Sequence, residues 1–174
     1  MISESYLNLL QDCRKTDASW GSSGHKHVTQ VWSLVRKLKV RTILDFGSGT
    51  GSFGREFESK RPEIVVTNYD PSFPEYAVYP TGIYDVIVAT HSLEHVEPDF
   101  IEATLEHFKN SCTKLVYIVV PHGPARKVLT DGRNAHLIQK SAKWWFELFS
   151  KFWPEQSIRV TSGQQNSTYI IRVN

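Results

Sequence analysis

RTILDFGSGTG, residues 41–51, joins a short apolar run to a turn that holds three glycines. The run has the length and composition of a buried strand, and glycine lets the chain turn tightly and approach a ligand closely. Phe53 and Phe57 follow at helical spacing, and the first free N–H groups of that helix would face the same point as the turn. This segment therefore predicts a strand, a ligand-binding turn and a helix.

Strand-like and helix-like segments alternate along the rest of the chain. Further strands are predicted at IVVTNYD (64–70), YDVIVAT (84–90) and KLVYIVV (114–120), and one helix is expected from Val28 to about Lys39. SIRVTS (157–162) and TYIIRV (168–173) are expected to form a closing antiparallel hairpin. The alternation indicates an α/β domain with a mainly parallel sheet. Ligands of such sheets bind beyond the carboxyl ends of the strands.

The composition is that of an ordinary soluble domain. The chain has 174 residues, of which 40% are hydrophobic and 22% charged, and this fits one domain with a full core. A net charge of +2 does not indicate a surface that binds nucleic acid. No apolar run approaches the ~20 residues that a membrane span needs. Cys13 and Cys112 form no metal-type spacing, and the N-terminus has no export signal. We therefore expect a cytoplasmic protein with free thiols.

Two acidic residues flank the glycine turn. Asp45 precedes the glycines in a D-x-G-x-G-x-G pattern, and Asp70 ends the next predicted strand, where a carboxylate can accept hydrogen bonds from a ribose diol. Gly49, Gly51 and Gly54 also match the G-x-G-x-x-G pattern of dinucleotide sites. The chain is too short for a dinucleotide domain with a separate substrate domain. An NAD-dependent or nucleotide-sugar enzyme is therefore the less favoured interpretation.

The D-x-G-x-G-x-G pattern resembles motif I of the class I S-adenosylmethionine-dependent methyltransferases. YDVIVATHSLEHVEP (84–98) is similar to the fourth-strand segment of that family, and the closing hairpin is similar to its reversed last strand. WGSSG (20–24), HGPARKVLTDGRNAHL (122–137) and KWW (143–145) are similar to segments of small bacterial and phage members. The resemblance covers most of the chain.

The resemblance implies a single-domain, Rossmann-like methyltransferase sheet over residues 1–174, with an N-terminal helical lid region (1–40) and a sheet core (41–174). It implies that S-adenosylmethionine is bound by residues that follow the strands and by Trp20 of the lid region. These residues are Asp45, Gly47, Ser48, Gly49, Gly51, Asp70, Pro71, Thr90, His91 and, in the lid, Trp20. A core or surface role for Trp20 is about equally consistent with the sequence.

The chain departs from the family between Asp70 and Asp85. The family inserts a helix, a strand and a helix there, and a crossover needs at least ~10–12 residues, so we expect a shortened third strand region with AVYP (77–80) as its remnant. The acid that contacts the adenine amino group in the family has no counterpart. Backbone or apolar contacts around Phe73 and Tyr76 would have to replace it.

THSLEHV (90–96) follows the third predicted strand. His91, Glu94 and His95 are spaced i, i+3 and i+4, so on a helix they would share one face. In one interpretation Glu94 and His95 only cap or pack a helix start, while His91 lines the cofactor pocket. In the other, the segment is similar to the E-x-x-E-H motif that binds a divalent cation in two branches of the family, with His91 in place of the first glutamate.

A fourth ligand for such a metal is available in the loop after KLVYIVV. The resemblance to the RNA-methylating branch implies that His136 joins His91, Glu94 and His95 in a metal site. Imidazole and carboxylate ligands suit Mn, Zn or Fe better than Mg. His95, His136 and Glu94 are accordingly the predicted catalytic residues. Without a metal, His95 or His136 could act as a general base.

The function expected from these features is methyl transfer from S-adenosylmethionine to an oxygen of a small, sugar-like or diol acceptor. A divalent metal would assist this reaction by lowering the pKa of the acceptor hydroxyl. Two alternatives stay open: a catalytically silent S-adenosylmethionine-binding protein, and a nucleic-acid methyltransferase. The low net charge disfavours the second of these.

Overall fold

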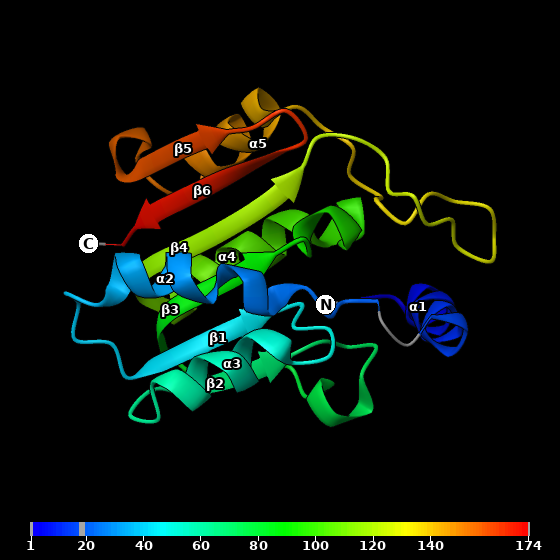
Figure 1. The fold of residues 1–174 in the computed structure, drawn as a ribbon. Helices are drawn as coiled ribbons and strands as arrows, with labels where there is room; N and C mark the ends of the chain where they lie inside the picture. The colour runs from blue at the N-terminus through cyan, green and yellow to red at the C-terminus, as the bar shows by residue number, and fades with distance from the viewer. Residues whose placement is uncertain (1, 18–19, 174) are drawn as a thin grey trace.

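One central sheet organises the protein, whose computed structural model describes residues 2–17 and 20–173 (Figure 1). Its six strands lie in the order β2-β1-β3-β4-β6-β5. Four of them are parallel: β1 (Thr42–Phe46), β2 (Val65–Tyr69), β3 (Tyr84–Thr90) and β4 (Cys112–Pro121). β6 (Asn166–Arg172) is antiparallel to β4, and β5 (Ile158–Ser162) is antiparallel to β6. The predicted mainly parallel α/β sheet with a C-terminal hairpin is confirmed.

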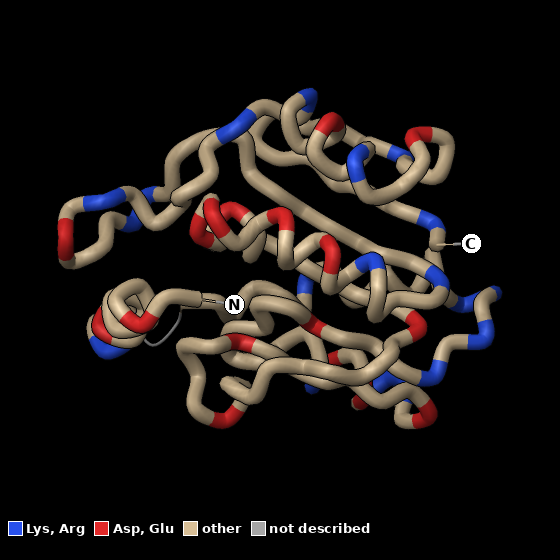
Figure 2. The backbone as a smooth tube through the Cα atoms, turned by 180° about the vertical axis from the view of Figure 1, so that it is seen from behind, with Lys and Arg blue, Asp and Glu red and all other residues tan. Residues whose placement is uncertain are grey.

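Helices cover both faces of this sheet (Figures 1 and 2). α2 (Val28–Val35) and α3 (Ser52–Lys60) pack on one face, and α4 (Ile101–Ser111) and α5 (Ala142–Ser150) pack on the other. Successive strand residues face opposite sides of the sheet. Ile43 of β1 therefore packs in the core beneath α2 and α3, and Leu44 packs in the core beneath α4 and α5. None of the helices among the described residues is long and apolar enough to span a bilayer.

α1 (Glu4–Thr16) lies apart from these layers, beyond the carboxyl ends of the strands (Figure 1). The Ser3 hydroxyl accepts a hydrogen bond from the Tyr6 amide and so caps the helix. A separate apolar cluster joins α1 to the loop after β4; its buried members are Tyr6, Leu10, Cys13, Leu129 and Ala135. Residues 1, 18–19 and 174 of the predicted domain lie outside the described residues.

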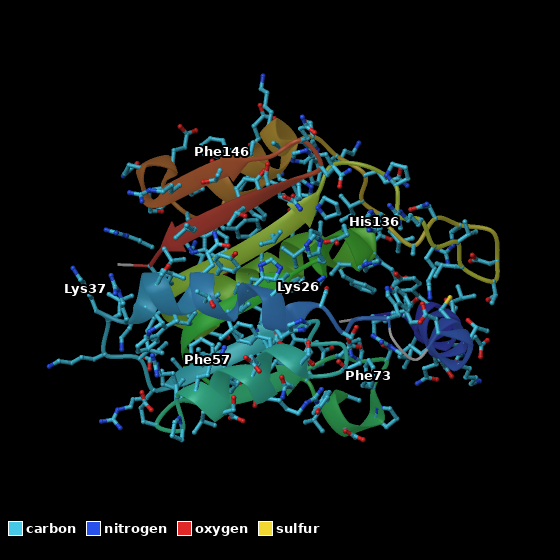
Figure 3. All side chains as sticks on the ribbon, in the orientation of Figure 1. Lys26, Lys37, Phe57, Phe73, His136 and Phe146 are labelled. Atoms are coloured by element: carbon cyan, nitrogen blue, oxygen red, sulfur yellow. The ribbon has the colours of Figure 1, made fainter. Side chains whose placement is uncertain are left out.

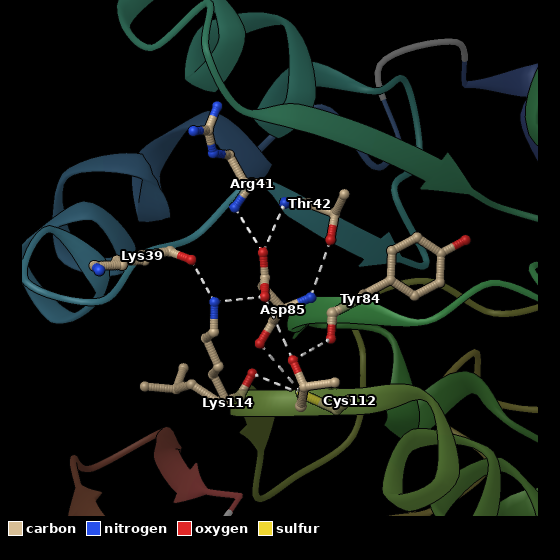
Figure 4. Close-up of polar contacts among 9 residues, drawn as sticks. Lys39, Arg41, Thr42, Tyr84, Asp85, Cys112 and Lys114 are labelled. Carbon is tan, nitrogen blue, oxygen red and sulfur yellow. Dashed lines mark hydrogen bonds and ion pairs between the residues drawn. The ribbon is translucent and has the colours of Figure 1, made fainter.

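The amino ends of three strands are held together by one carboxylate (Figure 4). Asp85 at the start of β3 accepts hydrogen bonds from the backbone N–H groups of Arg41 (2.6 Å) and Thr42 (3.2 Å). Its other oxygen forms an ion pair of 2.6 Å with Lys114 of β4. Lys114 also donates to the Lys39 carbonyl. The Asp85 carboxylate and the Lys114 ammonium therefore have partners within the chain.

Two predicted elements are wrong. The helix expected to reach Lys39 ends at Val35; Leu38 is 40% exposed, so it buries little surface that would hold another turn. AVYP (77–80) forms no strand; a short 3₁₀ helix, Pro74–Tyr76, leads almost directly to β3. The connection is too short for a second crossover, and β2 is left as the edge of the sheet.

THSLEHV does not form an α-helix either. Leu93–His95 make one 3₁₀ turn, and Val96 and Glu97 return to extended backbone. Pro98 explains this, because a proline disfavours helical backbone at the residue before it. His91 lies outside the turn, with a φ of 53°. The predicted shared helix face is therefore wrong, although the loop still turns the three side chains toward one region.

Candidate active site

The glycine turn after β1 is shaped by close contacts that only glycine allows. Gly47 and Gly49 have φ values of +76° and +54°, in the left-handed region. A Cβ on Gly47 would lie 2.2 Å from the Ser92 Cβ, and one on Gly49 would lie 2.2 Å from the Gly21 carbonyl oxygen. The amides of Gly47 and Ser48 donate to the Tyr69 carbonyl at 2.7 and 2.9 Å. The turn is thus fixed against the end of β2.

Two carboxylates lie beside this turn in different environments. Asp45 is 2% exposed, and its Oδ2 has no hydrogen-bond partner among the described residues. Burial, with a smaller contribution from the charge of Asp70, raises the pKa of Asp45 to about 8. The Oδ2 of Asp70 accepts from the Gly49 amide (3.0 Å) and from Arg14 (2.9 Å). The Ser48 hydroxyl is buried without a partner, so Asp45 and Ser48 together leave unmet hydrogen-bonding capacity at the turn.

Two adjoining cavities open at the carboxyl ends of the strands. The smaller, of about 100 Å³, lies between α1 and the sheet and reaches Gly47, Gly49, Asp70 and Pro71. The larger, of about 700 Å³, lies between the glycine turn and the loop after β4. Several residues line both cavities, so the two form one continuous site: Trp20, Gly21, Gly47, His91 and His95.

Most of the predicted cofactor residues line these cavities. Asp45, Ser48 and Thr90 line the larger one, and Asp70 and Pro71 line the smaller. Gly51 lines neither, because it lies at the start of α3 and its Cα faces the Tyr76 ring. Trp20 stands between the cavities, edge-on to His95 at 5.6 Å between ring centroids.

The structure brings His136 next to His95, although 40 residues of chain lie between them. Their ring centroids are 5.0 Å apart, and His136 lies in the loop after β4, as Figure 3 shows. Both Nε2 atoms approach the same Oε1 of Glu94, at 4.0 Å from His95 and 3.9 Å from His136. Glu94, His95 and His136 offer ligand atoms that all lie within 4.8 Å of one another. His91 is outside that set, with its Nδ1 3.8 Å from Glu94.

Backbone carbonyls fix the tautomers of His95 and His136. The Nδ1 of His95 lies 2.6 Å from the Ala135 carbonyl oxygen, and that of His136 lies 2.7 Å from the Gly123 carbonyl oxygen. A carbonyl only accepts, so each Nδ1 must carry the hydrogen. In the neutral rings the Nε2 atoms therefore present lone pairs toward Glu94. Both Glu94 oxygens lack a hydrogen-bond partner among the described residues, and its side chain is fully buried.

Burial disfavours the charged forms of His91, Glu94 and His95. It lowers the pKa of His95 to about 4, with the backbone hydrogen bond to Ala135 opposing the shift. Burial also lowers the pKa of His91 and raises that of Glu94 to about 8. Neutral imidazoles are the form that binds metals or accepts a proton. Glu94, His95 and His136 thus turn their potential ligand atoms toward one another.

Several neighbours of the site had no signal in the sequence. Arg14 reaches Asp70 from α1, and Tyr117 of β4 lies 3.3 Å from the Nδ1 of His27. His27 in turn lies 5.8 Å from His91 between ring centroids. These contacts join segments far apart in the chain through side chains that no local pattern marks. His122 also lines the larger cavity, with its Nε2 2.8 Å from the Ser167 hydroxyl.

Solved structures with the same fold are numerous. The chain matches the DhpI–SAH complex with 20% identity and a TM-score of 0.69, over 98% of this chain and 96% of that one. It matches a Burkholderia thailandensis 1,6-didemethyltoxoflavin-N1-methyltransferase with bound 1,6-didemethyltoxoflavin and S-adenosylhomocysteine at 14% identity and a TM-score of 0.67, over 100% and 91%.

A third structure, an O-methyltransferase family protein from Burkholderia thailandensis, has 12% identity and a TM-score of 0.60. The match covers 87% of this chain but only 58% of that protein, so the chain spans little more than half its length. No curated protein matches the chain in sequence.

The family model of the methyltransferase domain matches residues 25–162, from the 3₁₀ helix before α2 to the end of β5. The match includes the glycine turn, both carboxylates and the Glu94–His95–His136 cluster, and α1 lies outside it. The chain therefore belongs to the methyltransferase-domain family.

Proposed function

We propose that the protein transfers a methyl group from S-adenosylmethionine to a hydroxyl oxygen of a small acceptor, with a divalent metal ion held by Glu94, His95 and His136. One observation carries the proposal. Oε1 of the fully buried Glu94, which has no hydrogen-bond partner among the described residues, lies 3.9 and 4.0 Å from the Nε2 atoms of His136 and His95. Burying such a set of potential acceptors is costly unless its members share a proton, as the raised pKa of Glu94 indicates for the free protein, or hold a cation between them.

The glycine turn and its carboxylates fit the cofactor. The unpartnered Asp45 Oδ2 and Ser48 Oγ offer acceptors for the charged methionine end, and a nearby cation favours the ionised form of a buried acid. Asp70 at the end of β2 is suited to the ribose diol. Gly47 and Gly49 leave room where a side chain would intrude. We assign Pro71, Thr90, His91 and Trp20 to the surrounding wall, since all of them line the cavities.

The donor set also fits a metal ion. Bonds from a metal to imidazole nitrogen or carboxylate oxygen measure about 2.0–2.2 Å, so two ligand atoms of one ion lie at most about 4.4 Å apart. The two distances to Glu94 lie inside that limit. The Nδ1–H groups bonded to carbonyls match the usual outer support of histidine ligands. Two imidazoles and one carboxylate favour Mn, Zn or Fe over Mg; His91 stands beside this set, and we assign it to the cofactor wall.

Each part of the site then has one task in the reaction. The metal would act as a Lewis acid that lowers the pKa of an acceptor hydroxyl. Glu94, His95 and His136 would keep that position fixed against the glycine turn, since alignment of the reacting atoms is much of what the transfer requires. The acceptor oxygen gains the methyl carbon and gives up its proton to water. The cofactor sulfur keeps the electron pair of the broken C–S bond.

The larger cavity supports a small, polar acceptor. Its volume of about 700 Å³ lies in the range of small-molecule sites. Arg126, Gln164 and Gln165 contribute polar groups to its outer wall, which suits a sugar-like molecule or a diol. Basic residues are spread over many elements among acidic ones (Figure 2), and this disfavours the alternative of a nucleic-acid acceptor.

Calorimetric titration of Mn²⁺ and Zn²⁺ into metal-stripped protein saturated with S-adenosylhomocysteine tests the metal site. We expect one ion per chain in the wild type and no binding in a His95→Ala, His136→Ala double variant. A His25→Ala, His107→Ala double variant removes two histidines that line neither cavity and should bind as the wild type does. Wild-type protein that binds neither metal would contradict the metal assignment. Vicinal diols and catechols are then the acceptors to test for metal-dependent methylation.

A further inference from the structure

All acceptor positions of the Asp70 carboxylate are already filled from within the chain. Oδ2 accepts from the Gly49 amide (3.0 Å) and from the Arg14 Nη2 (2.9 Å). Oδ1 accepts from the Ser72 amide (3.0 Å) and from the Ser72 hydroxyl (2.5 Å). A carboxylate has about four lone-pair positions. A ribose diol therefore cannot bond to both oxygens unless at least one of these donors leaves.

Arg14 is the donor that comes from outside the sheet core. Its Nε donates to the Ser72 hydroxyl at 2.5 Å, so Arg14 and that hydroxyl reach Asp70 as one connected unit. The two backbone donors belong to turns packed at the ends of β1 and β2. Arg14 and the Ser72 hydroxyl are therefore the donors that can move.

Arg14 also holds the C-terminal end of α1 on the site. Its Nη1 donates to the Trp20 carbonyl at 2.9 Å, and its guanidinium lies 3.8 Å from the centre of the Phe73 ring. At the other end of α1, the Ser3 amide and hydroxyl donate to Glu97 at 2.8 and 2.6 Å. The smaller cavity lies between these two attachments, with Ile2, Tyr6 and Leu10 from the α1 side in its wall.

We propose that Arg14 is an internal competitor for the ribose diol at Asp70, so that cofactor binding releases the C-terminal end of α1 from the sheet. This inference rests on the proposed role of Asp70 in cofactor binding. Arg14 keeps the carboxylate paired in the free protein, and the two ribose hydroxyls take over that task when the cofactor binds. Part of the binding free energy is then spent on displacing an ion pair whose side chains are only 15% and 9% exposed.

Calorimetry with S-adenosylhomocysteine and with its 2′,3′-dideoxy analogue, in metal-free buffer, tests the competition. Arg14→Met keeps an apolar side chain against Phe73 but removes the competing donor. We expect it to bind S-adenosylhomocysteine about tenfold more tightly than the wild type, the size of one charge-assisted hydrogen bond. The dideoxy analogue makes no demand on Asp70, so its affinity should stay within about twofold.

Arg61→Met is the matched control. Arg61 also stacks on an aromatic ring, with 4.0 Å from its guanidinium to the Trp32 ring centre, but it lies away from both cavities. This variant should bind both ligands as the wild type does. The Arg14→Met protein should also melt at a lower temperature without ligand, because Asp70 loses its counter-ion, and show a larger stabilisation by S-adenosylhomocysteine.

Weaker or unchanged binding of S-adenosylhomocysteine by Arg14→Met would overturn the inference, because Arg14 would then support Asp70 instead of competing for it. An equal gain for the dideoxy analogue would overturn it as well. Wild-type protein that binds neither ligand would remove the cofactor assignment itself. The titrations contain no metal and no acceptor, so a failed metal site would leave their outcome unchanged.

Discussion

The two ends of the sheet treat the same residue type in opposite ways. Asp85, at the amino end, accepts hydrogen bonds from two backbone N–H groups and pairs with Lys114. Asp45, at the carboxyl end, is more deeply buried, and its Oδ2 has no partner. Glu94 extends the second pattern, because neither of its oxygens has a hydrogen-bond partner among the described residues. Asp85 at the amino end is thus satisfied within the chain, whereas Asp45 and Glu94 at the carboxyl end keep bonding capacity for a ligand at a cost in stability. Asp70, whose oxygens are filled by Arg14, Gly49 and Ser72, is the exception at that end.

The largest effect is expected where a side chain would fill the carboxyl end. Gly47→Ala puts a Cβ 2.2 Å from the Ser92 Cβ at a φ of +76°, which combines overpacking with left-handed backbone strain. We expect a loss of about 4 kcal/mol in the free energy of unfolding and no detectable binding of S-adenosylhomocysteine. Chemical denaturation and calorimetry measure the two effects.

Gly132→Ala separates strain from crowding. Gly132 has a φ of +87°, but a Cβ there would have no neighbour within 4 Å. Its substitution should cost about 1–2 kcal/mol, from the backbone conformation alone. Equal losses in the two variants would mean that the close approach to Ser92 has no bearing on stability.

The second-largest effect is expected from Asp45, in the dependence of the free energy of unfolding on pH. The pKa of Asp45 is raised to about 8 by burial and by Asp70, so between its unfolded value and pH 8 the folded state binds more protons than the unfolded state. Stability must then fall as the pH rises through this window. Between pH 6.5 and 8, Asp45 should contribute a loss of about 2 kcal/mol. Glu94, whose pKa is also raised to about 8, adds a similar slope to the wild type and to both variants.

Asp45→Asn and Asp85→Asn test this contrast with one chemical change. Partial burial opposes the shift, but the Lys114 hydrogen bond and the backbone donors of Arg41 and Thr42 lower the pKa of Asp85. Asp85 is thus ionised in both states above pH 6.5 and adds nothing to the slope. Urea denaturation across pH 6.5–8 should give a flatter slope for Asp45→Asn and the wild-type slope for Asp85→Asn. Identical slopes for both variants would show that Asp45 has an ordinary pKa.

The contrast also explains which features could be predicted from the sequence. The strands, the glycine turn and the hairpin follow from local pattern, because burial and turn geometry are set by neighbours in the chain. Pro98 was a local sign that THSLEHV could not continue as an α-helix, and it is the reason why the shared helix face was wrong. AVYP failed as a strand because the connection was too short to add one.

At the carboxyl end of the sheet, site residues could be predicted only where they match a motif of the family that the sequence resembles. The approach of His136 to His95 depends on how the loop after β4 folds back, and no spacing in the sequence encodes it. Arg14 is a stronger example, because its contact with Asp70 joins α1 to the end of β2. A lone arginine in an amphipathic helix resembles a solvated side chain until the tertiary structure gives it a partner.

The smallest effect concerns α1, which attaches to the carboxyl end without entering the sheet layers. Ser3 and Ser141 cap α1 and α5 in the same way, each hydroxyl accepting from the amide three residues later at 3.3 Å. Removing such a cap costs about 1 kcal/mol.

For α5, whose Trp145 and Phe149 lie in the core, we expect Ser141→Ala to lower the global free energy of unfolding by that amount. For α1, Ser3→Ala also removes the hydrogen bond from the hydroxyl to Glu97. We expect it to leave the global free energy of unfolding unchanged and to speed hydrogen exchange of α1 amides at least about fivefold, because α1 opens separately. A global loss in Ser3→Ala equal to that in Ser141→Ala would mean that α1 unfolds only with the core, and that no part of the carboxyl end moves independently to admit a ligand.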